Sequence, residues 1–380
     1  MANQSNNVEI SEEQKNNIVQ LGMKLYGLGI DAVYDGVETG PVVTGYFFKL
    51  KPNVSIKKIM NKAEDFALAM GVDKITIQRI SDRIVLFVPN KQRSNVDFKD
   101  ALYWYLNDPE VEKQELPILL GVDYHGRKSS IDLTEMPHML IAGETGSGKS
   151  VFEAGIISSL SYYKRPDELH FYLVDTKRVD LPLFSTLPHV KEVIETLEQF
   201  HARIDTIITE IRNRLAQLAG AGCRKIQDYH ALGYAMPYII VLIDEFGDLM
   251  DLDSVARRNG EYEDTPPVKQ RVKQIAQIAR AAGVHLILCT QRSSVKVVDG
   301  DTKTNLPCRI ALRLPTDADS RTILGTGGAQ NLLGKGDMLV QRPGKDIVER
   351  YHGPFVSMND IAELVTGYNM IKDTLKKKRT

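Results

Sequence analysis

Between about residue 116 and residue 365, short apolar runs alternate with segments in which apolar residues recur every three or four positions. The short runs are typical of strands, and the three- and four-residue spacing is typical of helices. Their alternation predicts an α/β domain with a mainly parallel sheet and helices on both faces. We predict strands at 138–142, 169–175, 238–243 and 283–292, a helix at 151–160, and a long helix within 190–218.

Residues 14–115 carry a different pattern, which predicts a small α+β domain. No catalytic group of residues is evident there, so we interpret this domain as a docking or spacing module. Its expected elements are helices at 14–30 and 55–70 and strands at 42–50, 74–80 and 83–89.

Three further segments are polar. Residues 1–13 are predicted to be disordered, and 251–267, which is acidic and contains two prolines, is predicted to be a mobile surface loop. Residues 366–380 form a basic tail in which Lys376–Arg379 either contact phosphates or are simply solvated.

Composition narrows the class of protein. The chain has 380 residues with a net charge of −1, so no overall basic field indicates nucleic acid and any DNA contact must be local. No apolar run approaches the roughly 18–20 residues that span a bilayer, so we expect no membrane span. Three widely spaced cysteines fit neither a disulfide framework nor a zinc site, which favours the cytoplasm.

The segment 143–150, Gly-Glu-Thr-Gly-Ser-Gly-Lys-Ser, follows one predicted strand and precedes a predicted helix. It fits the pattern G-x-x-x-x-G-K-[ST], and the order strand, loop, helix is the context of a P-loop. Backbone N–H groups of such a loop bind phosphate oxygens, the lysine reaches the β- and γ-phosphates, and the serine binds Mg²⁺. The expected nucleotide-binding residues are Gly143, Glu144, Thr145, Gly146, Ser147, Gly148, Lys149 and Ser150.

A second motif lies at the end of the predicted strand 238–243, where Asp244 and Glu245 follow six apolar residues. Such a strand is buried on both faces, and its carboxyl end lies at the edge of the sheet where ligands bind. We interpret the pair as a Walker B motif in which Asp244 binds Mg²⁺ and Glu245 polarises the attacking water. At the tip of the next strand, Gln291 is a candidate sensor of the γ-phosphate.

At this point the sequence resembles the FtsK/SpoIIIE family of double-stranded DNA translocases. The resemblance runs from about residue 25 to residue 361, and the segments 39–44, 89–91 and 120–123 resemble the small domain that precedes the motor in that family. The residues that carry it are 136–150 (MPHMLIAGETGSGKS), 243–250 (IDEFGDLM), 278–292 (IARAAGVHLILCTQR) and 319–338 (DSRTILGTGGAQNLLGKGDM).

The resemblance implies a RecA-like motor that assembles as a homo-hexameric ring around duplex DNA, with the small domains as a second tier. ATP and Mg²⁺ bind between subunits. Arg280 corresponds to the family's arginine finger, which acts on the neighbouring subunit's γ-phosphate. Arg321 is either a second residue that senses nucleotide across the interface or a member of a structural ion pair.

The same resemblance implies DNA contacts in the pore of the ring. Arg292 and Lys303 match positions that face DNA, and such contacts are largely independent of sequence and weakened by salt. At a third position, where family members can carry lysine, this chain has Asp317, for which Arg313 could compensate.

Two parts of the family are expected to be missing here, a membrane-spanning region and a C-terminal winged-helix domain, which needs on the order of 60 residues. Two alternatives to the DNA motor stay open. One is a coupling ATPase that engages a membrane or secretion-apparatus partner protein, and the other is a virion genome-packaging ATPase.

Overall fold

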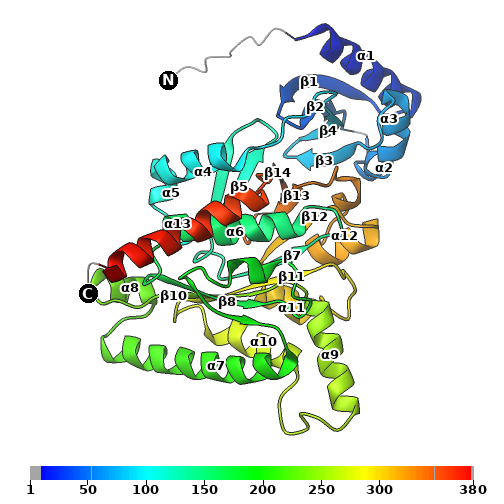
Figure 1. Cartoon of the computed structure of the whole chain (residues 1–380). Helices are drawn as coiled ribbons and strands as arrows, with labels where there is room; N and C mark the ends of the chain where they lie inside the picture. The colour runs from blue at the N-terminus through cyan, green and yellow to red at the C-terminus, as the bar shows by residue number, and fades with distance from the viewer. Residues whose placement is uncertain (1–9, 53, 346, 378–380) are drawn as a thin grey trace. The chain divides into compact units, whose positions relative to one another are not determined.

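The computed structural model describes residues 10–52, 54–345 and 347–377, and it divides into two compact units (Figure 1). The first unit holds the described residues up to Ser94 together with Tyr124–Arg127 and Asn331–Leu333, and the second unit holds the rest. The sequence predicts this division at residue 115. It falls earlier because α4 (Phe98–Asn107) and α5 (Pro109–Glu112) bury apolar side chains in the core of the second unit.

Among the described residues, the first unit has a four-stranded antiparallel sheet in the order β1-β2-β4-β3. Successive side chains of a strand point to opposite faces, and both faces are covered here. Ile84, Leu86 and Val88 pack with the helices, whereas Val85 and Phe87 pack on the other face. The elements are α1 (Glu12–Gly27), β1 (Ala32–Thr39), β2 (Val43–Leu50), α2 (Lys57–Met60), α3 (Ala63–Met70), β3 (Thr76–Ile80) and β4 (Arg83–Pro89).

The first unit differs from the sequence prediction at three places. Helix α1 begins inside the segment predicted to be disordered, because Ser11 and Gln14 form a capping box; residues 1–9 lie outside the described residues. The predicted helix 55–70 is two helices, with a break at Asn61 and Lys62. Strand β1 was not predicted, since its alternation is interrupted by a bulge near Gly36.

The second unit has, among the described residues, a ten-stranded sheet in the order β6-β5-β14-β13-β12-β7-β11-β10-β8-β9. The six strands β12-β7-β11-β10-β8-β9 run parallel to one another. The pairs on the other side, from β6 through to β13 against β12, are antiparallel. The predicted fold class, an α/β domain with a largely parallel sheet, is therefore confirmed. The strands are β5 (Pro117–Asp123), β6 (Lys128–Asp132), β7 (His138–Ala142), β8 (Leu169–Val174), β9 (Val190–Ile194), β10 (Tyr238–Ile243), β11 (Val284–Thr290), β12 (Cys308–Leu312), β13 (Asp337–Gln341) and β14 (Glu349–His352).

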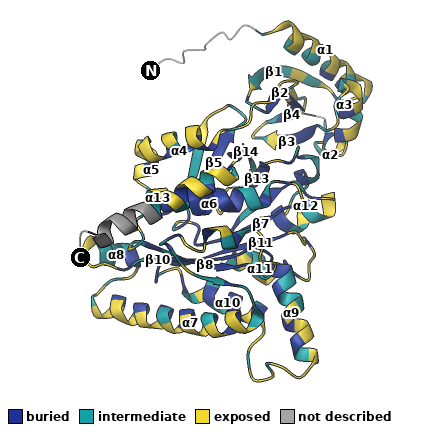
Figure 2. Cartoon of the chain, viewed as in Figure 1, coloured by how far each residue is buried: buried dark blue, intermediate teal, exposed yellow. Residues whose placement is uncertain are grey.

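Helices cover both faces of this sheet, with α4, α6 and α13 on one face and α7 and α10 on the other (Figure 1). The central strands β7, β10 and β11 are buried throughout (Figure 2). No helix of the described residues combines the length and apolar composition that crossing a membrane requires. The helices are α6 (Lys149–Tyr163), η1 (Leu181–Phe184), α7 (Leu197–Gly220), α8 (Ile226–Ala231), α9 (Phe246–Arg258), α10 (Val268–Ile278), α11 (Gly300–Asn305), α12 (Asp317–Leu324), η2 (Ala329–Asn331) and α13 (Met358–Lys377).

Three local predictions need correction in the second unit. The region 190–218 is a strand, β9, followed by α7, whose first turn is fixed by a capping box of Thr196 and Gln199. The predicted mobile loop 251–267 belongs to α9 as far as Arg258. The predicted basic tail is part of α13 up to Lys377, and residues 378–380 lie outside the described residues.

The loop after α9 is also held in place. Arg257 donates hydrogen bonds to the backbone carbonyls of Tyr262 at 2.9 Å and Thr265 at 2.7 Å. The same guanidinium bonds the Asp253 carboxylate at 3.0 Å. An acidic, proline-containing composition therefore does not make this segment a free loop.

Two buried histidines where β7 and β11 pair predict a pH dependence of stability. His138 Nδ1 accepts from the Leu286 N–H at 2.9 Å, and His285 Nδ1 donates to the Pro137 carbonyl at 2.8 Å. Burial lowers the pKa of His138 to about 3 and the pKa of His285 to about 4. Both stay neutral in the fold while the unfolded chain binds protons near pH 6.5, so stability is lost as pH falls from 6.5 towards 4. At pH 5 the loss is roughly 2 kcal/mol per histidine.

The measurement is Tm by near-UV circular dichroism at pH 7.5 and pH 5.0, in wild type and in His138→Asn. Asn keeps an acceptor where Nδ1 lies but does not titrate, so the variant should show a smaller fall in Tm between the two pH values. An equal fall in Tm in both proteins would show that His138 does not contribute to the loss of stability at low pH.

Candidate functional site

The carboxyl ends of β7, β11, β10 and β12 meet at one edge of the sheet because these strands are parallel neighbours. The P-loop leaves β7 there and is fixed to both adjacent strands. The Gly143 N–H donates to the Thr290 carbonyl of β11 at 3.2 Å, and the Glu144 N–H donates to the Arg313 carbonyl beyond β12 at 2.9 Å. The loop therefore keeps its shape through the strands on either side.

The P-loop backbone forms a cradle of unused donors. Gly146 has φ +78° and Gly148 has φ +101°, backbone conformations that residues with a side chain rarely adopt. In addition, a Cβ on Gly148 would lie 2.5 Å from the Gly336 nitrogen. Five N–H groups of the cradle have no hydrogen-bond acceptor among the described residues. Donors of this kind at a helix N-terminus form an anion site, so the loop fits the phosphates of ATP. These N–H groups belong to Thr145, Gly146, Gly148, Lys149 and Ser150.

Lys149 is buried beneath this cradle. Its Nζ donates to Asp244 Oδ1 at 2.6 Å, to the Asp244 carbonyl at 2.9 Å and to Glu153 Oε1 at 2.8 Å. Burial by itself lowers the pKa of Lys149, but the Glu153 and Asp244 carboxylates more than offset this and hold the pKa above its ordinary value. The lysine is therefore a stable cation in contact with the Walker B aspartate.

The residues expected to bind Mg²⁺ are Ser150, at the start of α6, and Asp244, at the end of β10. A hydroxyl and a carboxylate are oxygen ligands of the kind that Mg²⁺ takes together with nucleotide phosphates. The Lys149 ammonium 2.6 Å from Asp244 Oδ1 shows that this carboxylate already accepts a cation. The donor set fits the ion.

Glu245 is held by three donors at the N-terminus of α9. Its Oε1 accepts from the Thr290 hydroxyl at 2.6 Å and from the Gly247 N–H at 3.2 Å, and its Oε2 accepts from the Gln291 N–H at 2.7 Å. The residue is buried. A carboxylate fixed by β11 and α9 has the rigidity that positioning an attacking water requires.

Gln291 connects this carboxylate to the P-loop. Its side-chain oxygen accepts from the Thr145 hydroxyl at 3.0 Å, while its backbone N–H bonds Glu245. The structure thus brings together four residues predicted from sequence, namely Lys149, Asp244, Glu245 and Gln291. Thr290, which also contacts Glu245, was not predicted, because a lone threonine in a buried strand carries no sequence signal.

Arg313 lies at the P-loop. Its guanidinium pairs with the Glu144 carboxylate, and Gly334 lies beside it. This position does not favour the DNA contact that we expect of Arg313 from the sequence. It makes the arginine a neighbour of the phosphate cradle, which sequence spacing could not reveal because residues 144 and 313 meet only through β7–β12 pairing.

Arg280 lies at the opposite edge of the sheet, in the turn between α10 and the first residue of β11, Val284. It is exposed and has no ion-pair partner among the described residues. Strand β11 has seven residues, and at about 3.3 Å per residue its ends are roughly 20 Å apart. Arg280 is therefore remote from the P-loop of its own chain.

Arg321 pairs with Asp317 one turn earlier in α12, with Nε 2.6 Å from Oδ2. The Gln330 side chain donates to the other oxygen of Asp317 at 3.2 Å. The structural alternative that the sequence left open for Arg321 is thus present. Asp317 itself is occupied by these two partners.

Arg292 follows β11 directly and is held by α9. One of its nitrogens lies 2.7 Å from Asp248 Oδ1, and another pairs with Asp251. Lys296 lies 3.5 Å from Asp251, and Lys177 lies 2.8 Å from Asp248. The basic side chain expected to contact DNA is therefore part of a half-exposed cluster of opposite charges.

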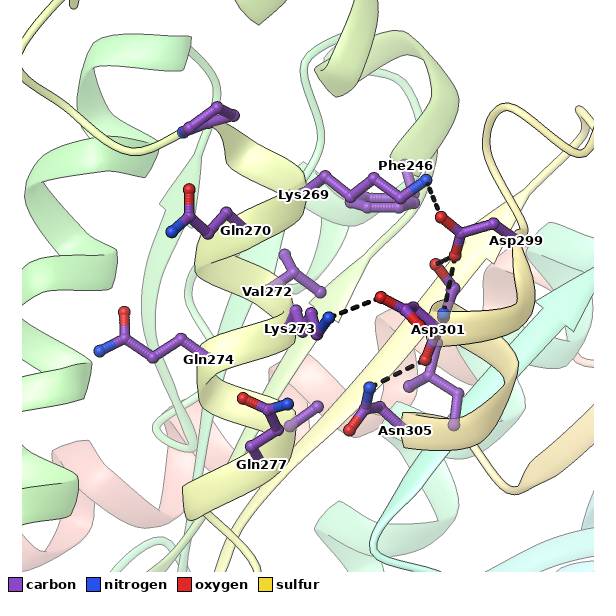
Figure 3. A pocket seen from close by; sticks show the side chains of 14 residues that line it. Phe246, Lys269, Gln270, Val272, Lys273, Gln274, Gln277, Asp299, Asp301 and Asn305 are labelled. Atoms are coloured by element: carbon purple, nitrogen blue, oxygen red, sulfur yellow. Dashed lines mark hydrogen bonds and ion pairs between the residues drawn. The ribbon is translucent and has the colours of Figure 1, made fainter.

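Lys303 lies on α11, and the described residues give it no ion-pair partner. Helix α11 borders a cleft of about 730 Å³ against α10 (Figure 3). Lys269 of α10 pairs with Asp299 at 2.7 Å, and Lys273 pairs with Asp301 at 2.6 Å. These pairs tie the short helix that carries Lys303 to α10.

Comparison with known proteins shows which family the chain resembles. The FtsK/SpoIIIE family profile matches residues 107–236 and 231–295, and the FtsK alpha domain profile matches residues 1–90. A DNA translocase FtsK of Staphylococcus epidermidis is 35% identical over 368 residues, 93% of this chain and 44% of that protein. One of Streptococcus pyogenes serotype M1 is 34% identical over 383 residues, 96% of this chain and 46% of that protein. The chain spans less than half the length of these relatives.

Solved structures support the fold. The pCW3 conjugation coupling protein TcpA, a monomer form with ATPγS, has a TM-score of 0.59 at 23% identity and covers 92% of this chain and 99% of its own. The cytoplasmic domain of the Thermomonospora curvata Type VII secretion ATPase EccC has a TM-score of 0.59 at 24% identity, over 72% of this chain and 34% of its own.

Proposed function

Because this chain belongs to the FtsK/SpoIIIE family of P-loop ATPases, we propose that it is an ATP-hydrolysing ring motor that moves double-stranded DNA. Hydrolysis uses the residues at the carboxyl edge of the sheet. The free N–H groups of the P-loop bind the phosphates, Lys149 neutralises charge on them, and Glu245 orients the attacking water. Mg²⁺ bound by Ser150 and Asp244 supplies charge neutralisation at the phosphates.

We infer that the ring consists of six copies with ATP between neighbours. The position of Arg280 supports the placement of ATP between subunits, since an arginine roughly 20 Å from its own P-loop can serve as an arginine finger only for another subunit. We propose that Arg321 senses the nucleotide bound to the neighbouring subunit. To do so, its side chain must first break the ion pair with Asp317.

We also propose that the protein works in the reducing cytoplasm. Two of its three free cysteines, Cys289 and Cys308, are buried thiols, which supports this location.

The observation that carries the proposal is that one helix, α9, connects Glu245 with the residues that hold Arg292. Glu245 caps its first turn, and Asp248 and Asp251 on the same helix hold Arg292. A DNA phosphate must displace these carboxylates before Arg292 can bind it. Because the same helix carries Glu245 at its start and the carboxylates that hold Arg292, a movement of α9 during the hydrolysis cycle would change how available Arg292 is to DNA and would couple hydrolysis to DNA binding.

The test is the ATPase rate with linear duplex DNA, single-stranded DNA or no DNA. Duplex DNA should stimulate the wild type, and Arg292→Ala/Lys303→Ala should lose the stimulation because two phosphate contacts are removed. Between 50 and 200 mM salt, those two contacts should account for roughly a tenfold loss of DNA affinity. Asp251→Asn should bind duplex DNA a few-fold more tightly than wild type, since one competitor for Arg292 and Lys296 has lost its charge.

The matched control is Arg212→Ala/Lys191→Ala, which removes two exposed basic residues of α7 and β9. If duplex DNA leaves the ATPase rate unchanged in wild type and in every variant, the proposal that the chain is a DNA motor is wrong.

That result would favour the second candidate, a coupling ATPase that engages a protein partner. One feature supports it specifically, a pocket of about 770 Å³ beside α9 whose lining holds five acidic residues and one lysine, namely Glu195, Glu198, Asp248, Asp251, Glu261 and Lys177. Leu252 and Val255 of α9 are 44% and 46% exposed in it. A basic, partly apolar segment of a partner protein fits this chemistry.

A further inference from the structure

Glu153 is a buried carboxylate that the ATPase site described above does not use. It lies one turn after Lys149 on α6, and its exposed fraction is 0%. A carboxylate out of contact with water is unfavourable unless a cation or hydrogen-bond donors compensate it. Its oxygen Oε1 accepts from Lys149, and Oε2 has no hydrogen-bond partner among the described residues.

The only cation that compensates Glu153 within the described chain is the P-loop lysine. The Asp244 carboxylate adds a like charge that raises the pKa of Glu153 further. The Cys289 thiol of β11 is also close, and burial raises its pKa well above the ordinary value, so it is neutral. Glu153 and Lys149 lie on the same helix at i and i+4, so the pair needs no other element in order to form.

Lys149 has no donor to spare in this arrangement. An ammonium has three N–H groups, and here they meet three acceptors, namely Glu153 Oε1, Asp244 Oδ1 and the Asp244 carbonyl. A β- or γ-phosphate oxygen can bind Nζ only by replacing one of them. Asp244 can turn to Mg²⁺ if the phosphate takes its place, whereas Glu153 has no other cation among the described residues if the phosphate takes its place.

We propose that Glu153 is a positioning residue that holds the Lys149 ammonium beneath the P-loop and competes with the nucleotide phosphates for it, thereby setting the affinity for ATP. The competition is independent of what the motor moves. It is reversible, since burial raises the pKa of Glu153 and the Lys149 ammonium lowers it, so the carboxyl can take up a proton from solvent when the ammonium leaves.

The experiment measures the equilibrium Kd of a fluorescent ATP analogue with Mg²⁺, in Glu153→Gln and in wild type. Glutamine keeps the shape and the acceptor of the side chain but removes its charge, so ATP should bind on the order of tenfold more tightly. The same substitution in a Lys149→Met background should change Kd less than twofold, because the competition acts through the lysine. A purely structural role of Glu153 would not depend on Lys149 in this way.

Two results would overturn the proposal. Weaker ATP binding in Glu153→Gln would mean that Glu153 directs the lysine towards the phosphates, and tighter binding that persists without Lys149 would mean that Glu153 acts by another route. If Glu153→Gln does not fold, Glu153→Met, which has similar length and no polar atoms, is compared in the same two backgrounds.

Discussion

Glu245→Gln is expected to lower ATP turnover by roughly 100-fold or more while ATP still binds. The reason is that an amide cannot accept a proton from the attacking water. Binding should survive because the amide can satisfy two of the three neighbours, and only the Gly247 N–H loses its acceptor. Its oxygen can face the Gln291 N–H, and its NH₂ can donate to the Thr290 hydroxyl, which turns to accept.

The measurement is steady-state ATPase rate beside Kd for a fluorescent ATP analogue. The matched control is Glu261→Gln, which makes the same chemical change at an exposed carboxylate after α9 and should leave both values unchanged. Turnover near the wild-type rate in Glu245→Gln would remove this carboxylate from the role of orienting water. Loss of binding together with turnover would indicate that the change had disturbed the P-loop instead.

Arg280→Ala is expected to lose ATPase activity by a factor of roughly 10³ or more when every subunit carries it, because arginine fingers contribute about that much. The arginine lies at the amino edge of the sheet and cannot reach its own P-loop. Activity should therefore return when Arg280→Ala protein is mixed with Glu245→Gln protein. In such a ring, some sites combine an intact Glu245 from one subunit with an intact Arg280 from its neighbour.

The control is Arg212→Ala, an exposed arginine of α7, which should retain activity alone and gain nothing on mixing with Glu245→Gln. Absence of recovery in rings shown to contain both proteins would contradict action in trans. Retained activity of Arg280→Ala alone would make this residue an ordinary surface charge.

Local features of the chain could be read from its sequence. Gly143–Ser150 and Asp244–Glu245 are contiguous motifs that lie at strand ends, and an apolar run such as 238–243 has only one environment that suits it, a central strand. The predicted strands β7, β8, β10 and β11 are present for this reason. Boundaries failed where side-chain capping by Ser11 or Thr196 decided the start of a helix, or where a bulge interrupted alternation in β1.

The order of the strands in the sheet could not be predicted from the sequence. Hydrophobic periodicity tells which face of a strand is buried but not which strand lies beside it. That order puts Arg313 against Glu144, Thr290 against Glu245, and the Walker B aspartate against Lys149. From the sequence we expect Arg292 to face DNA in the pore. In the structure it pairs with Asp248 and Asp251. The sequence by itself determined that the chain carries a P-loop and a Walker B motif, because these motifs are short enough to be local. Only the folded sheet decided that Asp244 restrains Lys149 and that Glu144 pairs with Arg313, since these partners lie 95 and 169 residues apart and meet through burial and strand pairing.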